Sequence, residues 1–269
     1  MEGTLMALDY GRLLDELRTE SDLLTGHLQD LPFEEWGRDT PAAGWSIQDQ
    51  VSHLAFFDDA AKLALRQPDD FRAMADRLIA GGMDFPDRIA EQHRILAPDA
   101  LLQWLLAARR DLLAALSEDD PKRRIPWFGP DMSVASCATA RLMETWAHGR
   151  DIYETIGVAP PASPGLRSIA HLGVSTFAFS HRLNGQDVPS EPVAVQLHSP
   201  GGETWTWGPQ DAADRITGTA EDFVLVVTQR RHWTDTGLTV EGPVATGWME
   251  VAQAFAGAAT KTEPKVQAR

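Results

Sequence analysis

Apolar residues recur with helical spacing through the first 157 residues of this 269-residue chain. A helix that carries an apolar stripe has to bury it against another element. Such stripes run through residues 5–30, 47–66, 86–117 and 133–157. Pro98 is expected to kink or split the third of these helices. Four long helices with no strand signal between them predict a four-helix bundle, which we assign to residues 1–160.

The chain after residue 160 has a different pattern, and a group of prolines marks the change: Pro160, Pro161 and Pro164. Beyond them, residues 193–197 and 203–207 alternate between apolar and polar side chains. Gly201 and Gly202 lie between the two segments, and this arrangement is typical of a β-hairpin.

Helical signals flank the predicted hairpin. Thr219 and Asp222 have the spacing of a capping box, and Pro243 suits the first turn of a last helix. We therefore predict a mainly α protein in which a small α+β domain, residues 165–257, follows the bundle. Residues 258–269 are small and polar, and we expect them to form a disordered tail.

Composition narrows the range of functions. The net charge of −15 disfavours binding to nucleic acid or to an anionic membrane surface. Cys137 is the only cysteine, so an intrachain disulfide is excluded. The chain has no basic, apolar leader at Met1–Asp9 and no apolar run of roughly 18 residues. These observations predict a soluble cytoplasmic protein.

Three residues form a candidate metal-ligand set. Glu144 and His148 are four residues apart in a predicted helix and so share one face, and His53 lies in a separate predicted helix. If these helices pack face to face, two histidines and one carboxylate come together with a coordination position left open. Catalytic zinc sites are built in this way.

The spacing also fits a simpler interpretation. Glu144 and His148 would then face water and form ordinary helical pairs with each other and with Arg141, and His53 would be a core histidine bonded to a carbonyl. If Glu144 instead faces inward, it needs a partner, because an unpaired buried carboxylate is costly. That partner would be a metal ion or an arginine such as Arg141.

Two segments carry a resemblance to known proteins. The stretch from Gly44 to Leu54, GWSIQDQVSHL, resembles the W-x-x-x-D-x-x-x-H-L signature of DinB-like metal-dependent bundle proteins. The stretch from Glu144 to Asp151, ETWAHGRD, is similar to the second signature of the mycothiol-dependent maleylpyruvate isomerase family. More narrowly, the chain resembles an actinobacterial subgroup described only as metal-binding proteins.

The resemblance implies a DinB-like bundle that binds zinc through His53, Glu144 and His148. It also implies a sterol-carrier-protein-like C-terminal domain. The resemblance further implies mycothiol as the cosubstrate. A thiol supplied from outside fits the sequence, because zinc stabilises a thiolate and the chain has no suitable cysteine of its own. The enzyme would be an isomerase or an S-transferase acting on a small molecule.

Other functions stay open at this stage. Zinc could activate water in a hydrolase, with Asp151 as the base. The protein could also hold a metal or carry a ligand without catalysis. Histidine and carboxylate ligands suit several divalent ions besides zinc. The sequence also leaves open a homodimer formed through the bundle.

Four further residues are candidates for the site. The resemblance implies an activity-supporting arginine in the C-terminal domain, and Arg230 is the nearest match, in a Gln-Arg-Arg context where the family more often shows Gly-Arg. The alternative is that Arg230 and Arg231 lie at the surface near a helix C-terminus. Asp151 could orient an imidazole or pair with a neighbouring charge. Trp127 and Phe128 could line a substrate pocket, or belong to the core.

Overall fold

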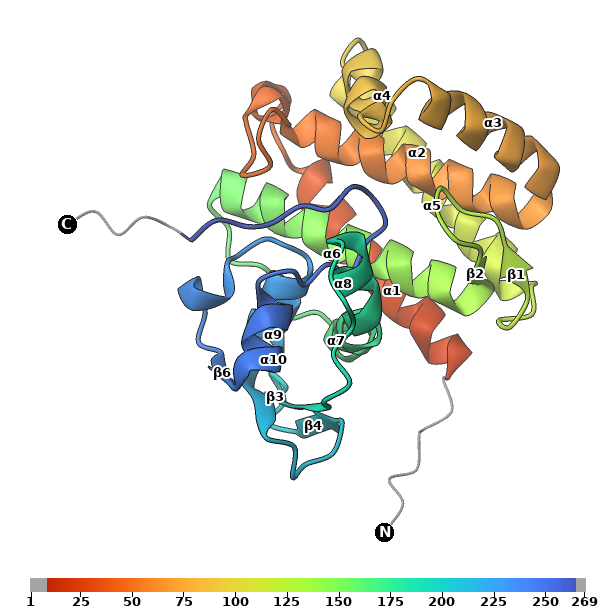
Figure 1. The fold of residues 1–269 in the computed structure, drawn as a ribbon. Helices are drawn as coiled ribbons and strands as arrows, with labels where there is room; N and C mark the ends of the chain where they lie inside the picture. Colours follow the sequence, from red (N-terminus) through yellow and green to blue (C-terminus); the bar gives the residue numbers. More distant parts are fainter. Residues whose placement is uncertain (1–8, 265–269) are drawn as a thin grey trace. The chain divides into compact units, whose positions relative to one another are not determined.

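The computed structural model describes residues 9–264 and is mainly helical, as predicted (Figure 1). The chain divides into two compact units, residues 1–165 and 166–269, and each is described by itself. Of the predicted tail, residues 265–269 lie outside the described part. Residues 258–264 form no helix or strand, and Thr260 accepts a hydrogen bond from Gln229 Nε2 at 2.8 Å through its carbonyl.

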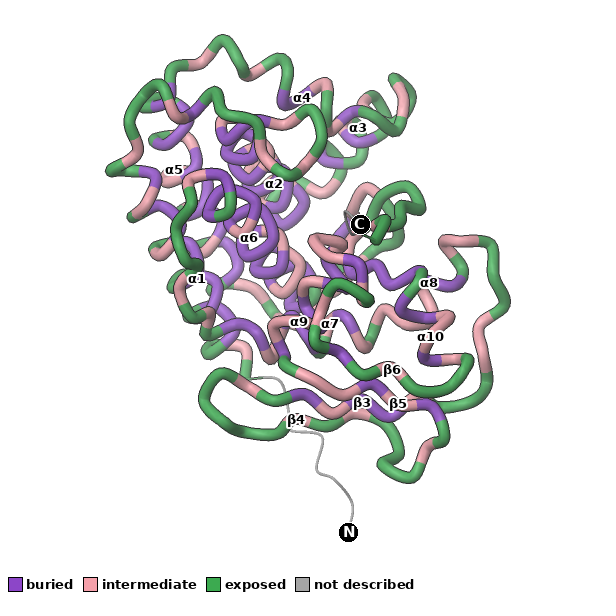
Figure 2. Tube along the Cα trace, turned by 90° about the vertical axis from the view of Figure 1, so that its left-hand side faces the viewer, coloured by how far each residue is buried: buried purple, intermediate pink, exposed green. Residues whose placement is uncertain are grey.

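Unit 1 is built on four long helices. Its elements are α1 (Tyr10–Gln29), the 3₁₀ helix η1 (Phe33–Gly37), α2 (Ile47–Arg66), α3 (Pro68–Ala80), α4 (Phe85–His93), α5 (Pro98–Ser117), β1 (Arg124–Ile125), β2 (Met132–Ser133) and α6 (Val134–Ile156). α2 packs against α5 and α6, and α1 packs against the same two helices. Figure 2 shows buried stretches along all four, so their apolar stripes meet in a common core.

Pro98 splits residues 86–117, which the apolar periodicity predicted as one helix, into two helices. α4 ends at His93, and Pro98 is the first residue of α5. Proline is well placed there because its missing N–H would have no intrahelical partner in a first turn. The short hairpin of β1 and β2, in which Arg124 pairs with Ser133, was not predicted. Each of its strands has two residues, too few for an alternation to be visible.

Capping fixes where the two site-bearing helices begin and end. Ser46 and Asp49 form a capping box at the start of α2. Asp49 is fully buried, and Arg94 donates to both of its carboxylate oxygens at 2.9 Å. Ser133 caps α6, and Gly157 ends it in the left-handed conformation with φ 70°. These signals make the bounds of α2 and α6 a property of the local sequence.

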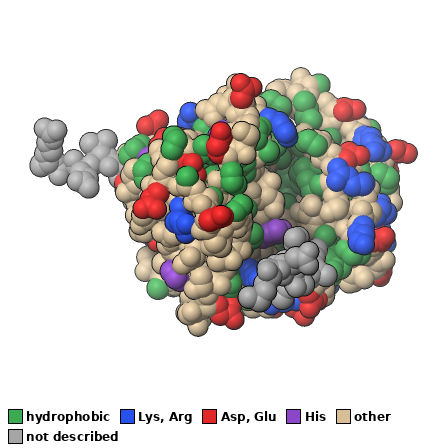
Figure 3. All heavy atoms as spheres, turned by 60° about the horizontal axis from the view of Figure 1, so that its bottom comes forward, with side chains coloured by type: hydrophobic (Ala, Val, Ile, Leu, Met, Phe, Trp, Pro, Cys, Tyr) green, Lys and Arg blue, Asp and Glu red, His purple; other side chains and the backbone are tan. Residues whose placement is uncertain are grey.

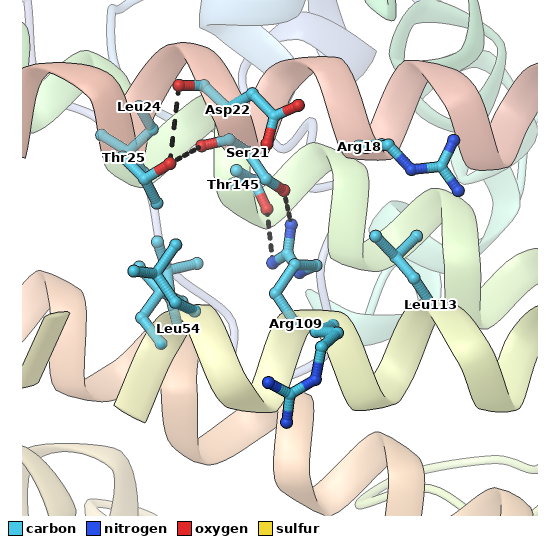
Figure 4. Close-up of a pocket in the computed structure, with 12 residues that line it drawn as sticks. Arg18, Ser21, Asp22, Leu24, Thr25, Leu54, Arg109, Leu113 and Thr145 are labelled. Atoms are coloured by element: carbon cyan, nitrogen blue, oxygen red, sulfur yellow. Dashed lines mark hydrogen bonds between the residues drawn. The ribbon is translucent and has the colours of Figure 1, made fainter. Parts of the chain in front are cut away.

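A buried charge cluster joins all four long helices. Asp58 of α2 accepts hydrogen bonds from Arg109 Nε of α5 at 2.6 Å and from Arg141 Nε of α6 at 2.9 Å. Arg109 also donates to Thr145 of α6 at 2.9 Å and to the hydroxyl of Ser21 on α1. Figure 4 shows Arg109 reaching from α5 toward Ser21 and Thr145. One carboxylate therefore ties together helices that are far apart in sequence.

A cavity of about 270 Å³ lies beside this cluster (Figure 4). Its lining comes from the same four helices, with Arg109 and Thr145 among the polar groups and Leu24, Leu54 and Leu113 among the apolar ones. His53, Glu144 and His148 are not among its lining residues.

Unit 2 combines helices with a small sheet. Its elements are α7 (Leu166–Ser175), α8 (Phe177–Leu183), β3 (Val193–His198), β4 (Thr204–Trp207), β5 (Asp214–Thr219), α9 (Ala220–Val227), the 3₁₀ helix η2 (Trp233–Asp235), β6 (Thr239–Glu241) and α10 (Pro243–Met249). The strand order is β4-β3-β5-β6, with β3 and β5 parallel and the other pairs antiparallel. The predicted hairpin is β3 and β4. Thr219 caps α9, because its hydroxyl oxygen accepts from the backbone N–H of Asp222 at 3.0 Å and its hydroxyl donates to the Asp222 carboxylate at 2.8 Å.

No sequence pattern predicted β5, which lies in the middle of the sheet. Ile216 is its only large apolar residue, and Gly218 adopts a φ of 155°. Its first residue, Asp214, is nearly buried and accepts hydrogen bonds from the backbone of Val244 and Ala245 at the start of α10. Asp214 therefore caps α10 from the first position of β5. Because this buried position holds a polar residue, β5 lacks the apolar alternation by which a strand is recognised in a sequence.

Within the described residues, none of the helices has both the length and the apolar character needed to cross a membrane.

We expect replacement of Asp58 by alanine to lower the free energy of unfolding by about 3–5 kcal/mol, because two buried arginines lose their shared carboxylate. Urea unfolding monitored by circular dichroism measures this change. Asp15→Asn is the control, since Asp15 pairs with Arg18 on the surface and its side chain is 73% exposed. A loss for Asp58→Ala no larger than that of the control would contradict the structural role of the cluster.

Candidate metal centre

His53, Glu144 and His148 come together between α2 and α6. One potential ligand atom from each side chain lies within 4.8 Å of the other two. Oε2 of Glu144 is 3.3 Å from His53 Nε2 and 3.0 Å from His148 Nε2. The two helices therefore pack as the candidate ligand set requires, and Glu144 does not face open water.

The three side chains are shielded but reachable. The exposed fractions are 12% for His53, 22% for Glu144 and 10% for His148. A small ligand or an ion can reach the carboxylate, while most of each imidazole is covered. This combination of shielding and access suits a site that binds a small molecule.

Glu144 is held in its ionised form. Burial alone would raise its pKa, but hydrogen bonds with His148 and His53, and the charge these rings carry when protonated, hold the pKa well below its usual range. Arg141, the alternative partner considered from the sequence, pairs with Asp58 and is 2% exposed. The carboxylate is therefore met by imidazoles and not by the nearby guanidinium.

This donor set fits a divalent metal ion. Two imidazole nitrogens and a carboxylate oxygen are ligand types that zinc and several other divalent ions accept. A cation between the three groups would neutralise the carboxylate and accept both nitrogen lone pairs. The ligand set has three members, so a fourth position would be left for a substrate or a thiol.

Aromatic rings surround the two histidines. Trp45 stacks on His148, with ring centroids 5.8 Å apart and planes 15° from parallel, and lies 5.1 Å from His53. Its indole N–H donates to Asp87 of α4 at 2.7 Å. Phe57 packs on the other imidazole, 4.5 Å from His53. Trp45 is half-buried and contacts both candidate histidine ligands.

Trp127 and Phe128 lie one layer further out. Their rings are 6.4 and 5.4 Å from Phe57, which separates them from His53. The same apolar cluster includes Phe85 of α4. That Trp127 and Phe128 line a substrate pocket stays a prediction. Phe57 is the ring that contacts both of them and His53.

Gln50 is a site residue that the sequence interpretation missed. It is fully buried on α2, three residues before His53, and its side-chain carbonyl accepts a hydrogen bond from His148 Nδ1. Asp151, the predicted orienting residue, is buried on α6, and its backbone carbonyl accepts from Thr155 at 2.8 Å. The available signal for Gln50 was its i,i+3 relation to His53 on the core face of a helix.

Arg230 belongs to unit 2 and follows α9. One of its guanidinium nitrogens donates to the carbonyl of Thr228 at 2.8 Å. The preceding residue, Gln229, has a φ of 58°, which glycine adopts more readily than other residues. A backbone of this shape accounts for the Gly-Arg sequence that the resemblance associates with this position. The role of Arg230 in activity stays a prediction.

Cys137 is not available as a nucleophile. It is 1% exposed, and burial raises the pKa of its thiol to about 12, although Arg141 partly opposes this shift. A thiol of this kind is almost entirely protonated at neutral pH, and the thiolate is the reactive form. Any thiol chemistry at the site therefore needs a thiol from outside the chain.

Figure 3 shows that acidic, basic and apolar side chains are interspersed on the face it presents.

The sequence matches one family over much of its length. Residues 17–153, about half of the chain, match the family described as the mycothiol maleylpyruvate isomerase N-terminal domain. A shorter segment, residues 189–240, matches a family described as wyosine base formation. The first match contains all three candidate ligands, and the second contains β3, β4 and β5 and ends within β6.

Relatives and solved structures extend these matches. Uncharacterized proteins of two Mycobacterium tuberculosis strains are each 43% identical over 93% of this chain and 97% of their own length. Crystal structures of a mycothiol-dependent maleylpyruvate isomerase and of a histidine-to-alanine variant share the fold, with a TM-score of 0.60 and 16% identity. The similarity covers 88% of this chain and 95% of those chains.

We expect Cys137 to react with a disulfide reagent such as DTNB far more slowly in the native protein than in the unfolded one. A pKa of about 12 leaves roughly a thousandfold less thiolate than an ordinary cysteine has. The absorbance of the released thiolate measures the rate with and without guanidinium chloride, and Cys137→Ser gives the blank. Equal rates in the two conditions would show that the thiol is accessible.

Proposed function

Because the chain belongs to the mycothiol maleylpyruvate isomerase family, we propose that it is a metal-dependent enzyme that uses mycothiol as a cosubstrate. The reaction is either the isomerisation of a small unsaturated molecule or its conjugation to the thiol. The observation that carries the proposal is the convergence of His53, Glu144 and His148 within 4.8 Å at a partly accessible point.

His53, Glu144 and His148 would hold the ion. When bound, the ion supplies charge that lowers the pKa of a coordinating thiol toward neutrality. Glu144 supports this role because its carboxylate oxygen Oε2 lies 3.3 Å from His53 Nε2 and 3.0 Å from His148 Nε2. Zinc is the ion we favour, because three protein ligands of these types are usual for catalytic zinc.

The other residues of the site control access and geometry. Trp45 and Phe57 cover the imidazoles and keep bulk water from most of their surface. In an isomerase, the thiol of mycothiol adds to an activated double bond, the former double bond rotates, and elimination returns the thiol unchanged. In a transferase the adduct is the product. Cys137 cannot replace mycothiol, because its thiol is buried and protonated.

The finer assignments of fold follow the same resemblance. We propose that unit 1 is a DinB-like four-helix bundle, supported by the mutual packing of α1, α2, α5 and α6. We propose that unit 2 is related to sterol-carrier-protein-like domains, supported by its four-stranded mixed sheet and its helices. Trp127 and Phe128, behind Phe57, are proposed to border the substrate.

The purified protein is expected to contain close to one divalent ion per chain, and His53→Ala and His148→Ala are expected to lose it. Mass spectrometry of the metal content measures this directly. His27→Ala is the matched control, because His27 bonds to the carbonyl of Leu23 on its own helix. Folded protein that contains no metal and takes up none when zinc is added would refute the metal site.

Arg230→Met is expected to lower kcat/KM in a mycothiol-dependent assay by about 10- to 100-fold while leaving metal content unchanged, as loss of one charged contact to a transition state would. Arg231→Met is the matched control at the neighbouring position. Equal effects of the two substitutions, or full activity of Arg230→Met, would remove Arg230 from the proposed machinery.

A further inference from the structure

The segment before α2 is folded back on itself next to the candidate metal centre. The backbone N–H and the hydroxyl of Thr40 both donate to the carbonyl of Trp45 at 2.8 Å. Asp39 and Ser46 form an isolated β-bridge, and the N–H of Ile47 donates to the carbonyl of Arg38 at 3.1 Å. The loop between η1 and α2 is therefore closed by its own backbone hydrogen bonds.

Gln50 connects this loop to His148. Its side-chain N–H donates to Thr40 Oγ1 at 2.8 Å, and its carbonyl oxygen accepts from His148 Nδ1. The side chain of Gln50 is fully buried, so both ends of the amide are satisfied inside the protein. The hydrogen bonds run from Trp45 through Thr40 and Gln50 to the imidazole.

The direction of these hydrogen bonds follows from the Thr40 hydroxyl. Because this hydroxyl donates to the carbonyl of Trp45, its oxygen is left as an acceptor and faces the N–H of Gln50. The carbonyl end of the amide then faces His148, and a carbonyl can only accept. Nδ1 of His148 must therefore carry the proton.

We propose that Gln50 is a positioning residue that holds His148 in the Nδ1–H form, so that the Nε2 lone pair is presented to the metal position beside Glu144. The inference rests on the metal site of the proposed function. The hydrogen bond to the second ring nitrogen decides which nitrogen of a ligating histidine is free to coordinate. Thr40 fixes the amide, and Trp45 holds the same ring from its face, 5.8 Å between centroids.

The contact between His148 and Glu144 gives a reason why the Nδ1–H form of His148 favours binding of a cation. With the proton on Nδ1 of a neutral His148, the Nε2 lone pair points toward the carboxylate oxygen Oε2 of Glu144, 3.0 Å away. Two electron-rich atoms at this distance repel each other unless a cation or a proton lies between them. Gln50 thus turns a histidine–glutamate contact into a pair of metal ligands.

The first test is the protonation of the His148 ring, read from ¹⁵N–¹H NMR spectra of the metal-free protein and assigned by loss of the signals in His148→Ala. The proposal requires a proton on Nδ1 without metal and with zinc. A bare Nδ1 in wild type overturns the proposal, whatever the metal content. This measurement is made on the wild-type protein, so it does not depend on whether a Gln50 variant folds.

The second test compares zinc affinity among Gln50 variants by competition with a chromogenic chelator. Gln50→Leu removes the acceptor and is expected to weaken zinc binding by about 10- to 100-fold. Gln50→Glu keeps an acceptor and is expected to stay within about threefold of wild type. Gln48→Leu, the same substitution at a half-buried position two residues away, is the control.

The outcomes distinguish the positioning role of Gln50 from the metal site of the proposed function. Weak binding in Gln50→Leu, with normal binding in Gln50→Glu and Gln48→Leu, supports the positioning role. Equal affinity in all four proteins overturns it and leaves the metal site intact. Absence of zinc binding by wild type, with the proton of His148 on Nδ1, overturns the proposed function and leaves the assignment of the ring proton standing.

Discussion

The packing of unit 1 depends on one buried carboxylate. Asp58 pairs with Arg109 and Arg141, and through Arg109 the cluster reaches all four long helices. Such ion pairs contribute less to stability than to the choice of one arrangement, since a shift of any helix would leave a buried charge without its partner. Asp58 lies five residues after His53, and Arg141 lies three before Glu144. The register set by the cluster is therefore the register that brings the candidate ligands together.

The sequence predicted unit 1 well wherever a local signal determines the structure. The capping box of Ser46 and Asp49, the first-turn Pro98 and the terminal Gly157 each have a physical effect within a few residues, and each marks a helix end in the structure. β5 was missed because its place in the sheet comes from pairing with β3, which is distant in sequence, and because Asp214 begins it. Helix ends are local, whereas the pairing of a polar strand is not.

The candidate site divides in the same way. His53, Glu144 and His148 could be named as candidates because the two segments that carry them resemble known metal-binding signatures, whereas the spacing of Glu144 and His148 alone also fits an ordinary helical pair. Gln50 and Trp45 could not, since a buried amide and an aromatic residue have many uses, and only the fold shows that both contact His148. The sequence also could not show that Arg141 pairs with Asp58 and that Glu144 is met by His53 and His148.

The burial of Cys137 has a consequence for the behaviour of the protein under oxidative stress. The chain's single thiol is shielded, so oxidants that act on cysteine have no ready target in the folded protein. If turnover uses mycothiol as proposed, oxidation of the thiol pool would stop the reaction by removing the cosubstrate while Cys137 stays reduced. Activity would then follow the redox state of the cell, and it would return without new protein synthesis once the pool is reduced.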